Sequence, residues 1–288
     1  MEVELLVDAK AITGEGPVWD ERDDCLWWVD IMRGHLHRYD PANDSDTVIE
    51  VGKHTGAAIP RRSGGFVLAV TDGFDVLDSD GNISHWLDVE AGDAGTRMND
   101  AKCDSNGRMF AGTMPYEFGE GEGALYRLDG DGSVREVVAN ITVSNGTDWN
   151  LADDTMYYVD SMTHRIDVFD YDSATGSISN RRPLVEVPGD LGAPDGLTVD
   201  AEGFIWVAVY GASRVQRYSP AGKLDGEITL PASQITSVAF GGEGYRDLYI
   251  TSATEDFDEV DFVREPAGGA LFRTRPGIAG RAPNIYGG

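Results

Sequence analysis

Ile205-Trp206-Val207-Ala208-Val209, followed by Gln216-Arg217-Tyr218-Ser219-Pro220, is the pair of segments that decides the fold of this chain. The first segment is a short apolar run, and the second ends in a turn signal. Pairs of this kind recur six times at intervals of roughly 40 to 50 residues, the period of four-stranded propeller blades. The other apolar runs lie at residues 26–29, 66–70, 109–112, 156–159 and 248–250.

This repeat predicts an all-β fold: a six-bladed β-propeller of four-stranded antiparallel blades, with residues 1–288 forming one domain. Val, Ile, Tyr, Phe and Trp concentrate in short runs that are separated by Asp-Gly, Asn-Gly, Pro and Gly-Gly signals. No long stretch keeps a helical period, and the 36 Gly and 12 Pro would interrupt one. Because a propeller gathers distant residues around one channel, the repeat also predicts which side chains meet.

The charge of the chain is strongly negative. Its formal net charge is -27, and such a field repels phosphate backbones, so we expect no binding to nucleic acid or to anionic membranes. The positive charges are almost all Arg, since Lys occurs only at positions 10, 53, 102 and 223. An acidic, Lys-poor surface stays hydrated in concentrated salt, which suggests a halophilic source. The alternative is an ordinary acidic surface encoded by a GC-rich genome.

The sequence also predicts the compartment. The first residues lack the basic and apolar regions of a signal peptide, and no apolar run is long enough to span a membrane. Cys25 and Cys103 fall in different repeats and are interpreted as reduced core thiols. We therefore expect a cytoplasmic protein, either a monomer or a weak homo-oligomer, with a small molecule as its partner.

The repeat can be used as a ruler to locate a site. About 10 to 12 residues before each apolar run lies the segment that should open the blade as its innermost strand. Four of the six openings begin with an oxygen-bearing side chain: Glu15, Asn99, Asn145 and Asp195. Equivalent positions point toward one end of the channel, so these oxygens should converge on a divalent cation such as Ca, Mg, Mn or Zn. The alternative is plain turn chemistry, because Asn-Gly and Asp-Gly are common turn dipeptides.

Other catalytic chemistries lack their motifs. The five histidines show no His-Glu-x-x-His spacing, and there is no Gly-x-Ser-x-Gly elbow and no P-loop. Asp100 and Asp148 flank the expected ligands; they are either partners that orient the ligands or turn residues, and the turn interpretation is preferred by a little. Metal-assisted attack by water is the simplest chemistry that remains.

Several segments resemble the SMP-30/gluconolactonase/luciferin-regenerating family, and the resemblance extends over essentially the whole chain. The segments that carry it are Gly14-Glu15-Gly16-Pro17-Val18-Trp19, Arg97-Met98-Asn99-Asp100, Ser144-Asn145-Gly146-Thr147-Asp148-Trp149 and Pro194-Asp195-Gly196. The resemblance implies a propeller with one divalent metal that hydrolyses glucono- or pentonolactones to aldonic acids.

Site residues follow from this resemblance. It implies Glu15, Asn145 and Asp195 as metal ligands, and Arg97, Asn99 and Glu117 as substrate-binding residues. Asp195 is the candidate catalytic general base, because a carboxylate at the metal can take the proton of a water. The segment that begins at Pro115-Tyr116 departs from the family pattern, so Glu117 matches less closely than the other positions do.

Two other functions stay open. Propellers often serve as interaction platforms, so a non-catalytic calcium-binding or regulatory propeller is one alternative. A metal-dependent esterase or a hydrolase of the phosphotriesterase type is another. Arg97 and Asn99 favour the lactonase, since a simple calcium binder does not need groups that orient a sugar.

Overall fold

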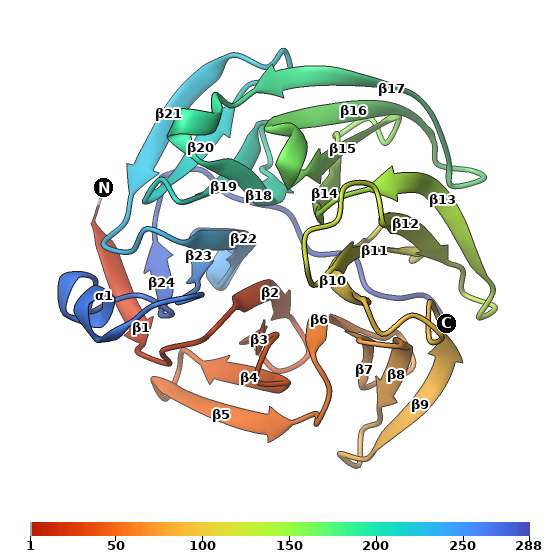
Figure 1. Cartoon of the computed structure of the whole chain (residues 1–288), viewed down its shortest axis with the longest axis horizontal. Helices are drawn as coiled ribbons and strands as arrows, with labels where there is room; N and C mark the ends of the chain where they lie inside the picture. The colour runs from red at the N-terminus through yellow and green to blue at the C-terminus, as the bar shows by residue number, and fades with distance from the viewer. Residues whose placement is uncertain (1) are drawn as a thin grey trace.

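Twenty-four strands form six four-stranded antiparallel sheets around a central axis in the computed structural model, which describes residues 2–288 (Figure 1). The predicted all-β, six-bladed propeller is confirmed. Blades 1 to 3 comprise β2 (Gly14–Asp20), β3 (Cys25–Asp30), β4 (His35–Asp40) and β5 (Ser45–Glu50); β6 (Thr55–Pro60), β7 (Phe66–Val70), β8 (Gly73–Leu77) and β9 (Ile83–Asp88); and β10 (Thr96–Cys103), β11 (Met109–Pro115), β12 (Gly123–Leu128) and β13 (Val134–Ile141). Blades 4 to 6 comprise β14 (Ser144–Trp149), β15 (Thr155–Asp160), β16 (Arg165–Asp172) and β17 (Ser177–Glu186); β18 (Ala193–Val199), β19 (Ile205–Tyr210), β20 (Arg214–Tyr218) and β21 (Leu224–Thr229); and β22 (Ile235–Gly241), β23 (Asp247–Ser252), β24 (Leu271–Thr274) and β1 (Val3–Val7).

The apolar runs are the second strands of the blades, β3, β7, β11, β15, β19 and β23. Every residue of β7 is buried, because the sheets stack face to face and a middle strand has no side toward solvent. The core is accordingly a set of layers between blades. One layer joins Tyr157 and Val159 of blade 4 to Val199 and Ile205 of blade 5.

The N-terminal strand closes the ring. β1 is the outer strand of blade 6 and pairs with β24, so that Val3 lies opposite Thr274. This arrangement covers an edge that would otherwise expose unpaired backbone groups. The repeat did not predict β1, because the strand precedes the first complete blade.

Helical structure is short. The α-helix α1 spans Glu259–Arg264, and 3-10 turns occupy Ser161–Thr163, Gly189–Leu191 and Glu243–Tyr245. Among residues 2–288, none of these helices has the length and apolar character needed to cross a membrane. Cys25 and Cys103 are free and buried, as expected for core thiols.

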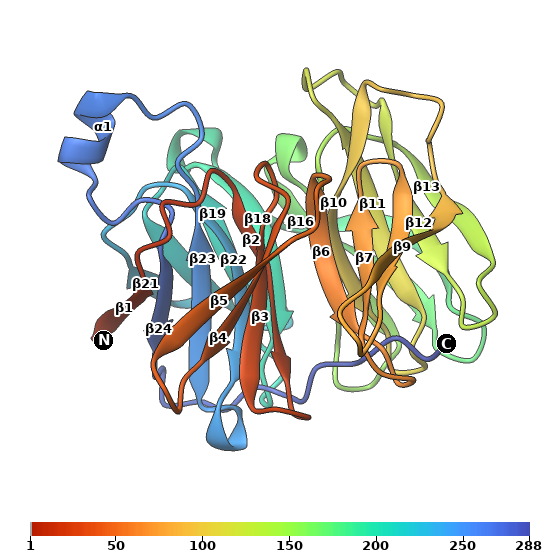
Figure 2. The ribbon, with the colours of Figure 1, turned by 90° about the horizontal axis from the view of Figure 1, so that it is seen from below.

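The two ends of the propeller axis carry different elements. Figure 2 shows α1 at one end, called here the upper end, and the C-terminal segment crossing the opposite, lower end. That segment bonds to several blades: Gly280 N donates to Tyr245 O over 2.8 Å, Asn284 Nδ2 to Cys103 O over 3.2 Å, and Tyr286 N to Pro60 O over 2.8 Å. The lower mouth of the channel is thereby covered.

Candidate metal and substrate site

Every inner strand is interrupted by a register shift, and four of the predicted site residues, Glu15, Asn99, Asn145 and Asp195, lie at these shifts. The shifts fall between Glu15 and Val18, Thr55 and Ala57, Met98 and Ala101, Ser144 and Thr147, Pro194 and Leu197, and Ile235 and Ser237. An irregularity of this kind breaks the alternation of side chains and re-aims one of them. This explains why residues in the same phase of the repeat can all turn toward the channel.

Glycines after the site residues let the inner strands approach closely. A Cβ on Gly146 would lie 2.5 Å from the backbone oxygen of Asp195, and one on Gly196 would overlap the side chain of Ser237. The Gly in these Asn-Gly and Asp-Gly pairs is therefore required by packing around the channel, because any larger residue would push the strands apart. The pairs are not hairpin turns, since both lie inside strands β14 and β18.

A chain of hydrogen bonds fixes the orientation of Asn145. Ser161 Oγ donates to Pro194 O over 2.7 Å, so its lone pairs accept the bond of 2.9 Å from Asn145 Nδ2. The amide nitrogen of Asn145 is thus engaged away from the cavity, and its Oδ1 remains as the available ligand atom. Asn99 Nδ2 reaches the same Oδ1 over 3.2 Å and also donates to Ser144 O over 2.8 Å.

Glu15 and Asp195 are buried carboxylates with few partners. Glu15 Oε2 accepts a bond of 2.6 Å from Gly16 N, whereas Asp195 Oδ1 is buried and has no partner among the described residues. Burial, followed by the charge of Asp100, raises the pKa of Glu15 well above its usual range. Burial, followed by the charge of Glu15, does the same to the pKa of Asp195.

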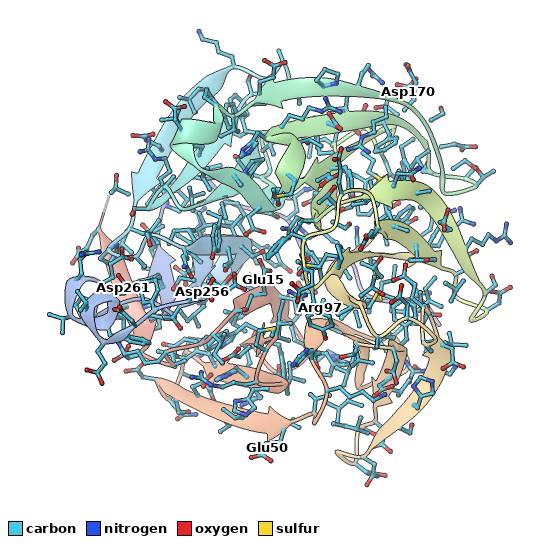
Figure 3. The ribbon with its side chains drawn as sticks, viewed as in Figure 1. Glu15, Glu50, Arg97, Asp170, Asp256 and Asp261 are labelled. Atoms are coloured by element: carbon cyan, nitrogen blue, oxygen red, sulfur yellow. The ribbon has the colours of Figure 1, made fainter. Side chains whose placement is uncertain are left out.

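Arg97 lies beside these carboxylates, and Figure 3 labels it close to Glu15 near the centre of the ring. It is 4% exposed, and its NH1 donates to Asn99 Oδ1 over 2.7 Å and to Met98 O over 3.0 Å. Its Nε has no partner among the described residues. Burial lowers the pKa of Arg97. Asn99 therefore connects the guanidinium to the expected ligand Asn145.

These side chains line one cavity of about 250 Å³ at the upper end of the channel. Five of the six predicted site residues line it: Glu15, Arg97, Asn99, Asn145 and Asp195. One part of its wall is apolar and is formed by Met114, Phe118, Val143 and Met162. Two of these residues, Phe118 and Met162, are also 54% and 51% exposed.

Glu117 is not among the residues that line this cavity. It lies in the loop between β11 and β12 with an exposed side chain. The next residue, Phe118, has a positive φ of 52° and lines the cavity instead. The assignment of Glu117 as a substrate-binding residue stays a prediction.

Asp100 and Asp148 are not turn residues, and the interpretation of them as such is wrong. Both lie inside inner strands, β10 and β14, and line a second cavity in the lower half of the channel. The turn signals around them reflected the register shifts of the inner strands. These irregularities use the same small and polar residues as hairpin turns.

Glu255, which follows β23 and lines the upper cavity, was not predicted from the sequence. It is not at a blade opening, so the spacing of the repeat did not predict it. The topology could have found it. Antiparallel second strands end where the inner strands begin, and the loop after β23 must therefore lie at the upper end.

A second group of titratable side chains lies in blade 2. Ligand atoms of Asp72, Asp75 and His85 lie within 4.8 Å of one another. Lys53 Nζ donates to Asp72 over 2.8 Å and to Asp75 over 3.3 Å, so its ammonium already balances much of this negative charge. A cation would have to displace that ammonium.

The upper cavity fits a hard divalent cation better. Glu15, Asn145 and Asp195 present carboxylate and amide oxygens, which are the donors that Ca, Mg and Mn prefer. The unpartnered Oδ1 of Asp195 is an atom that such an ion would satisfy. Arg97 acts against the effect of burial on Glu15, but the pKa values of both carboxylates remain raised, so its charge only partly balances theirs.

A closed six-bladed propeller with buried carboxylates, an amide oxygen and an arginine at one channel mouth defines a class of ligand-binding propellers. Within that class the chain belongs to the SMP-30/gluconolactonase/LRE-like family, whose sequence pattern matches residues 13–254. The resemblance that the motifs indicated is thereby confirmed.

Individual relatives agree with this membership. The chain is 37% identical to regucalcin of Xenopus laevis, covering 100% of this chain and 99% of the relative. It is 36% identical to the "Putative sugar lactone lactonase YvrE" of Bacillus subtilis (strain 168), with the same coverage. A crystal structure of regucalcin from Agrobacterium tumefaciens, described as a calcium-binding protein, superimposes with a TM-score of 0.95 at 27% identity, covering 99% of this chain and 97% of that one.

Proposed function

We propose that this protein is a divalent-metal-dependent hydrolase that opens sugar lactones, glucono- or pentonolactones, to aldonic acids. Water adds to the lactone carbonyl and the ring C–O bond breaks, so that each turnover yields one carboxylic acid. The reaction class is that of the hydrolases that act on carboxylic ester bonds.

The observation that carries the proposal is that the carboxylate of Asp195 is buried and incompletely hydrogen-bonded. Its side chain is buried, its Oδ1 lacks a partner, and Glu15 and Glu255 add negative charge nearby. Keeping such a group buried costs free energy unless a ligand completes it. Arg97 and Asn99 line the same cavity, so the incomplete carboxylate lies beside groups that can hold a polar organic substrate.

A cation held by Glu15, Asn145 and Asp195 would supply Lewis-acid chemistry, polarising a carbonyl and lowering the pKa of a bound water. In this proposal one oxygen of the Asp195 carboxylate would hold the cation, and the other accepts the proton of the attacking water and returns it to the departing ring oxygen. The network through Ser161 keeps the oxygen of Asn145, rather than its NH₂ group, toward the cavity.

Arg97 binds and orients the substrate in this proposal. Two of its hydrogen bonds hold the guanidinium in place, and its remaining N–H groups are available to hydroxyl or carbonyl oxygens. Asn99 uses its whole amide to connect Arg97 to Asn145, so it acts as a positioning residue. Pre-orientation of this kind is a large part of what an active site contributes to rate.

A non-catalytic calcium-binding propeller is the second candidate. It is supported by the description of the Agrobacterium tumefaciens relative as a calcium-binding protein. The two candidates share the cation and differ in turnover. A calcium binder leaves Arg97 without a use, which favours the hydrolase.

The test is a pH-indicator assay on a panel of aldonolactones, with and without EDTA. We expect acid release above the spontaneous rate that EDTA abolishes and added divalent metal restores. Asp195→Ala should lose nearly all turnover, and Asn99→Ala should lose less. If no lactone gives EDTA-sensitive acid release, the calcium-binding candidate replaces the hydrolase.

A further inference from the structure

Glu255 occupies the upper cavity without any role in the chemistry described above. It lies in the loop between β23 and α1, and its side chain is partly exposed to the cavity. Figure 3 shows the neighbouring Asp256 between the ring centre and α1, so this loop approaches the mouth from the side of blade 6.

The carboxylate of Glu255 is held by hydroxyl groups from two other blades. Thr13 Oγ1, just before β2, donates to Oε1 over 2.6 Å, and the Tyr210 hydroxyl at the end of β19 donates to Oε2 over 3.0 Å. The backbone is fixed as well. Glu255 N donates to Gln234 Oε1 over 2.7 Å, while Gln234 Nε2 donates to Glu255 O over 2.9 Å.

These contacts hold the carboxylate without using up its acceptors. Each carboxylate oxygen can accept two hydrogen bonds, and each oxygen of Glu255 receives one from the protein side chains named. Among residues 2–288 the Glu255 carboxylate is held by these hydroxyls rather than by an ion pair, although its charge also acts on Arg97 in the same cavity and raises the Arg97 pKa against the effect of burial. One acceptor per oxygen is therefore left for donors inside the cavity.

The other residues that line the cavity indicate which hydrogen-bonding groups a ligand would bring to Glu255. The wall of Met114, Phe118, Val143 and Met162 offers no hydrogen bonds, whereas Arg97 can only donate. Glu255 is a fixed, charged acceptor in the same cavity, and it suits a ligand with O–H groups.

We infer that Glu255 is a specificity-determining residue whose carboxylate accepts hydrogen bonds from the ring hydroxyls of a polyhydroxylated lactone, so that the site prefers hydroxylated lactones to their deoxy counterparts. This inference rests on the proposed function. It adds the feature of the substrate that the site recognises and the residue that recognises it.

The experiment compares wild type and Glu255→Gln on an aldono-1,4-lactone and on analogues that lack ring hydroxyls, including γ-butyrolactone. Gln keeps the shape of the side chain, and the Thr13 and Tyr210 hydroxyls can donate or accept, so the fold should be retained. Loss of charge-assisted bonds should lower kcat/KM for the hydroxylated lactone by about 10- to 100-fold, mainly through KM. Hydrolysis of γ-butyrolactone should change by less than about threefold.

Glu259→Gln is the matched control, because this exposed residue at the start of α1 loses the same charge four positions away. It should leave both substrates unaffected. Binding of a hydroxylated lactam, measured by calorimetry, gives a readout without turnover, and Glu255→Gln should weaken it by a similar factor.

Three results overturn the inference. Equal losses on hydroxylated and deoxy lactones would show that Glu255 acts on the site as a whole. Loss of divalent-cation binding in Glu255→Gln would make the residue a metal ligand. Absence of lactone hydrolysis by the wild type would overturn the proposed function, and the inference with it, whereas the first two results leave the proposed function intact.

Discussion

Asp195 and Asp148 are buried carboxylates on neighbouring inner strands, at opposite ends of one channel. At the upper end, Asp195 Oδ1 has no partner within the described chain, and burial together with Glu15 raises the pKa of Asp195. At the lower end, burial alone would raise the pKa of Asp148, but Lys102 and Arg281 outweigh it and hold the pKa below its usual range.

The lower carboxylate is fully partnered. Arg281 NH2 lies 3.0 Å from Asp148 Oδ1 and Lys102 Nζ lies 3.3 Å from Oδ2, while Trp149 N and Val199 N donate over 2.8 and 2.9 Å. Arg281 belongs to the C-terminal segment, so this carboxylate helps to anchor the segment that covers the lower mouth. The fold satisfies the carboxylate that serves stability, and it leaves incomplete the one at the cavity where we propose that a ligand binds.

Asp195→Asn should have the largest effect. The change removes the proposed general base and a charged ligand atom, so we expect kcat for lactone hydrolysis to fall by about 10³-fold or more. Stability without metal should not fall, because the variant relieves an unpaired buried charge. Hydrolysis at the wild-type rate would contradict the assignment, and a large drop in melting temperature would contradict the claim that this end is incomplete.

Divalent cations should stabilise the upper end selectively. A ligand that binds only the folded state contributes about 2.7 kcal/mol at 100 times its Kd, which corresponds to about 5 to 10 °C in Tm for a chain of this size. We expect this shift in the wild type after EDTA treatment and return of Ca, Mn, Mg or Zn. Asp195→Asn should lose it and Asp148→Asn should keep it. An equal shift in both variants would place the cation elsewhere, with the group of Asp72, Asp75 and His85 as the first site to examine.

Asp148→Asn should destabilise the fold and spare the chemistry. It leaves Lys102 and Arg281 without their carboxylate, and since both cations keep about a third of their side chains exposed, we expect about 2 kcal/mol rather than the full cost of a buried pair. The measurement is the free energy of unfolding in urea, with kcat per folded molecule as its counterpart. A loss of kcat with unchanged stability would reverse the roles of the two ends.

The fold could be predicted because its information is local and repeated. Each blade carries its own apolar run and turn signal, and six copies leave few architectures. The ring closure could not be predicted in the same way, because pairing of Val3 with Thr274 depends on two chain segments that meet only after the ring has formed.

The candidate site likewise contains residues that the repeat predicts and residues that it does not. Glu15, Asn99, Asn145 and Asp195 share a phase of the repeat, and the structure places all four on one cavity. Glu255 lies in a loop with no repeat partner, and its position depends on contacts with blades 1 and 5. Glu117 illustrates the limit of motif transfer, because a loop that departs from the family pattern placed Phe118 on the cavity instead.

The pH dependence of the unfolding free energy lost in Asp148→Asn should reveal whether folding raises or lowers the pKa of Asp148. The folded-state pKa of Asp148 lies below its ordinary value of 3.8, so its contribution is fully present above the unfolded pKa of about 3.9 and is lost as pH falls through the folded value. The difference in unfolding free energy between wild type and Asp148→Asn should therefore stay constant from pH 7 to pH 5 and shrink only below about pH 4. Denaturation in urea at each pH measures it. A difference that instead grows as pH falls from 7 to 5 would mean that the Asp148 pKa is raised, as at the upper end, and the contrast between the two ends would be lost.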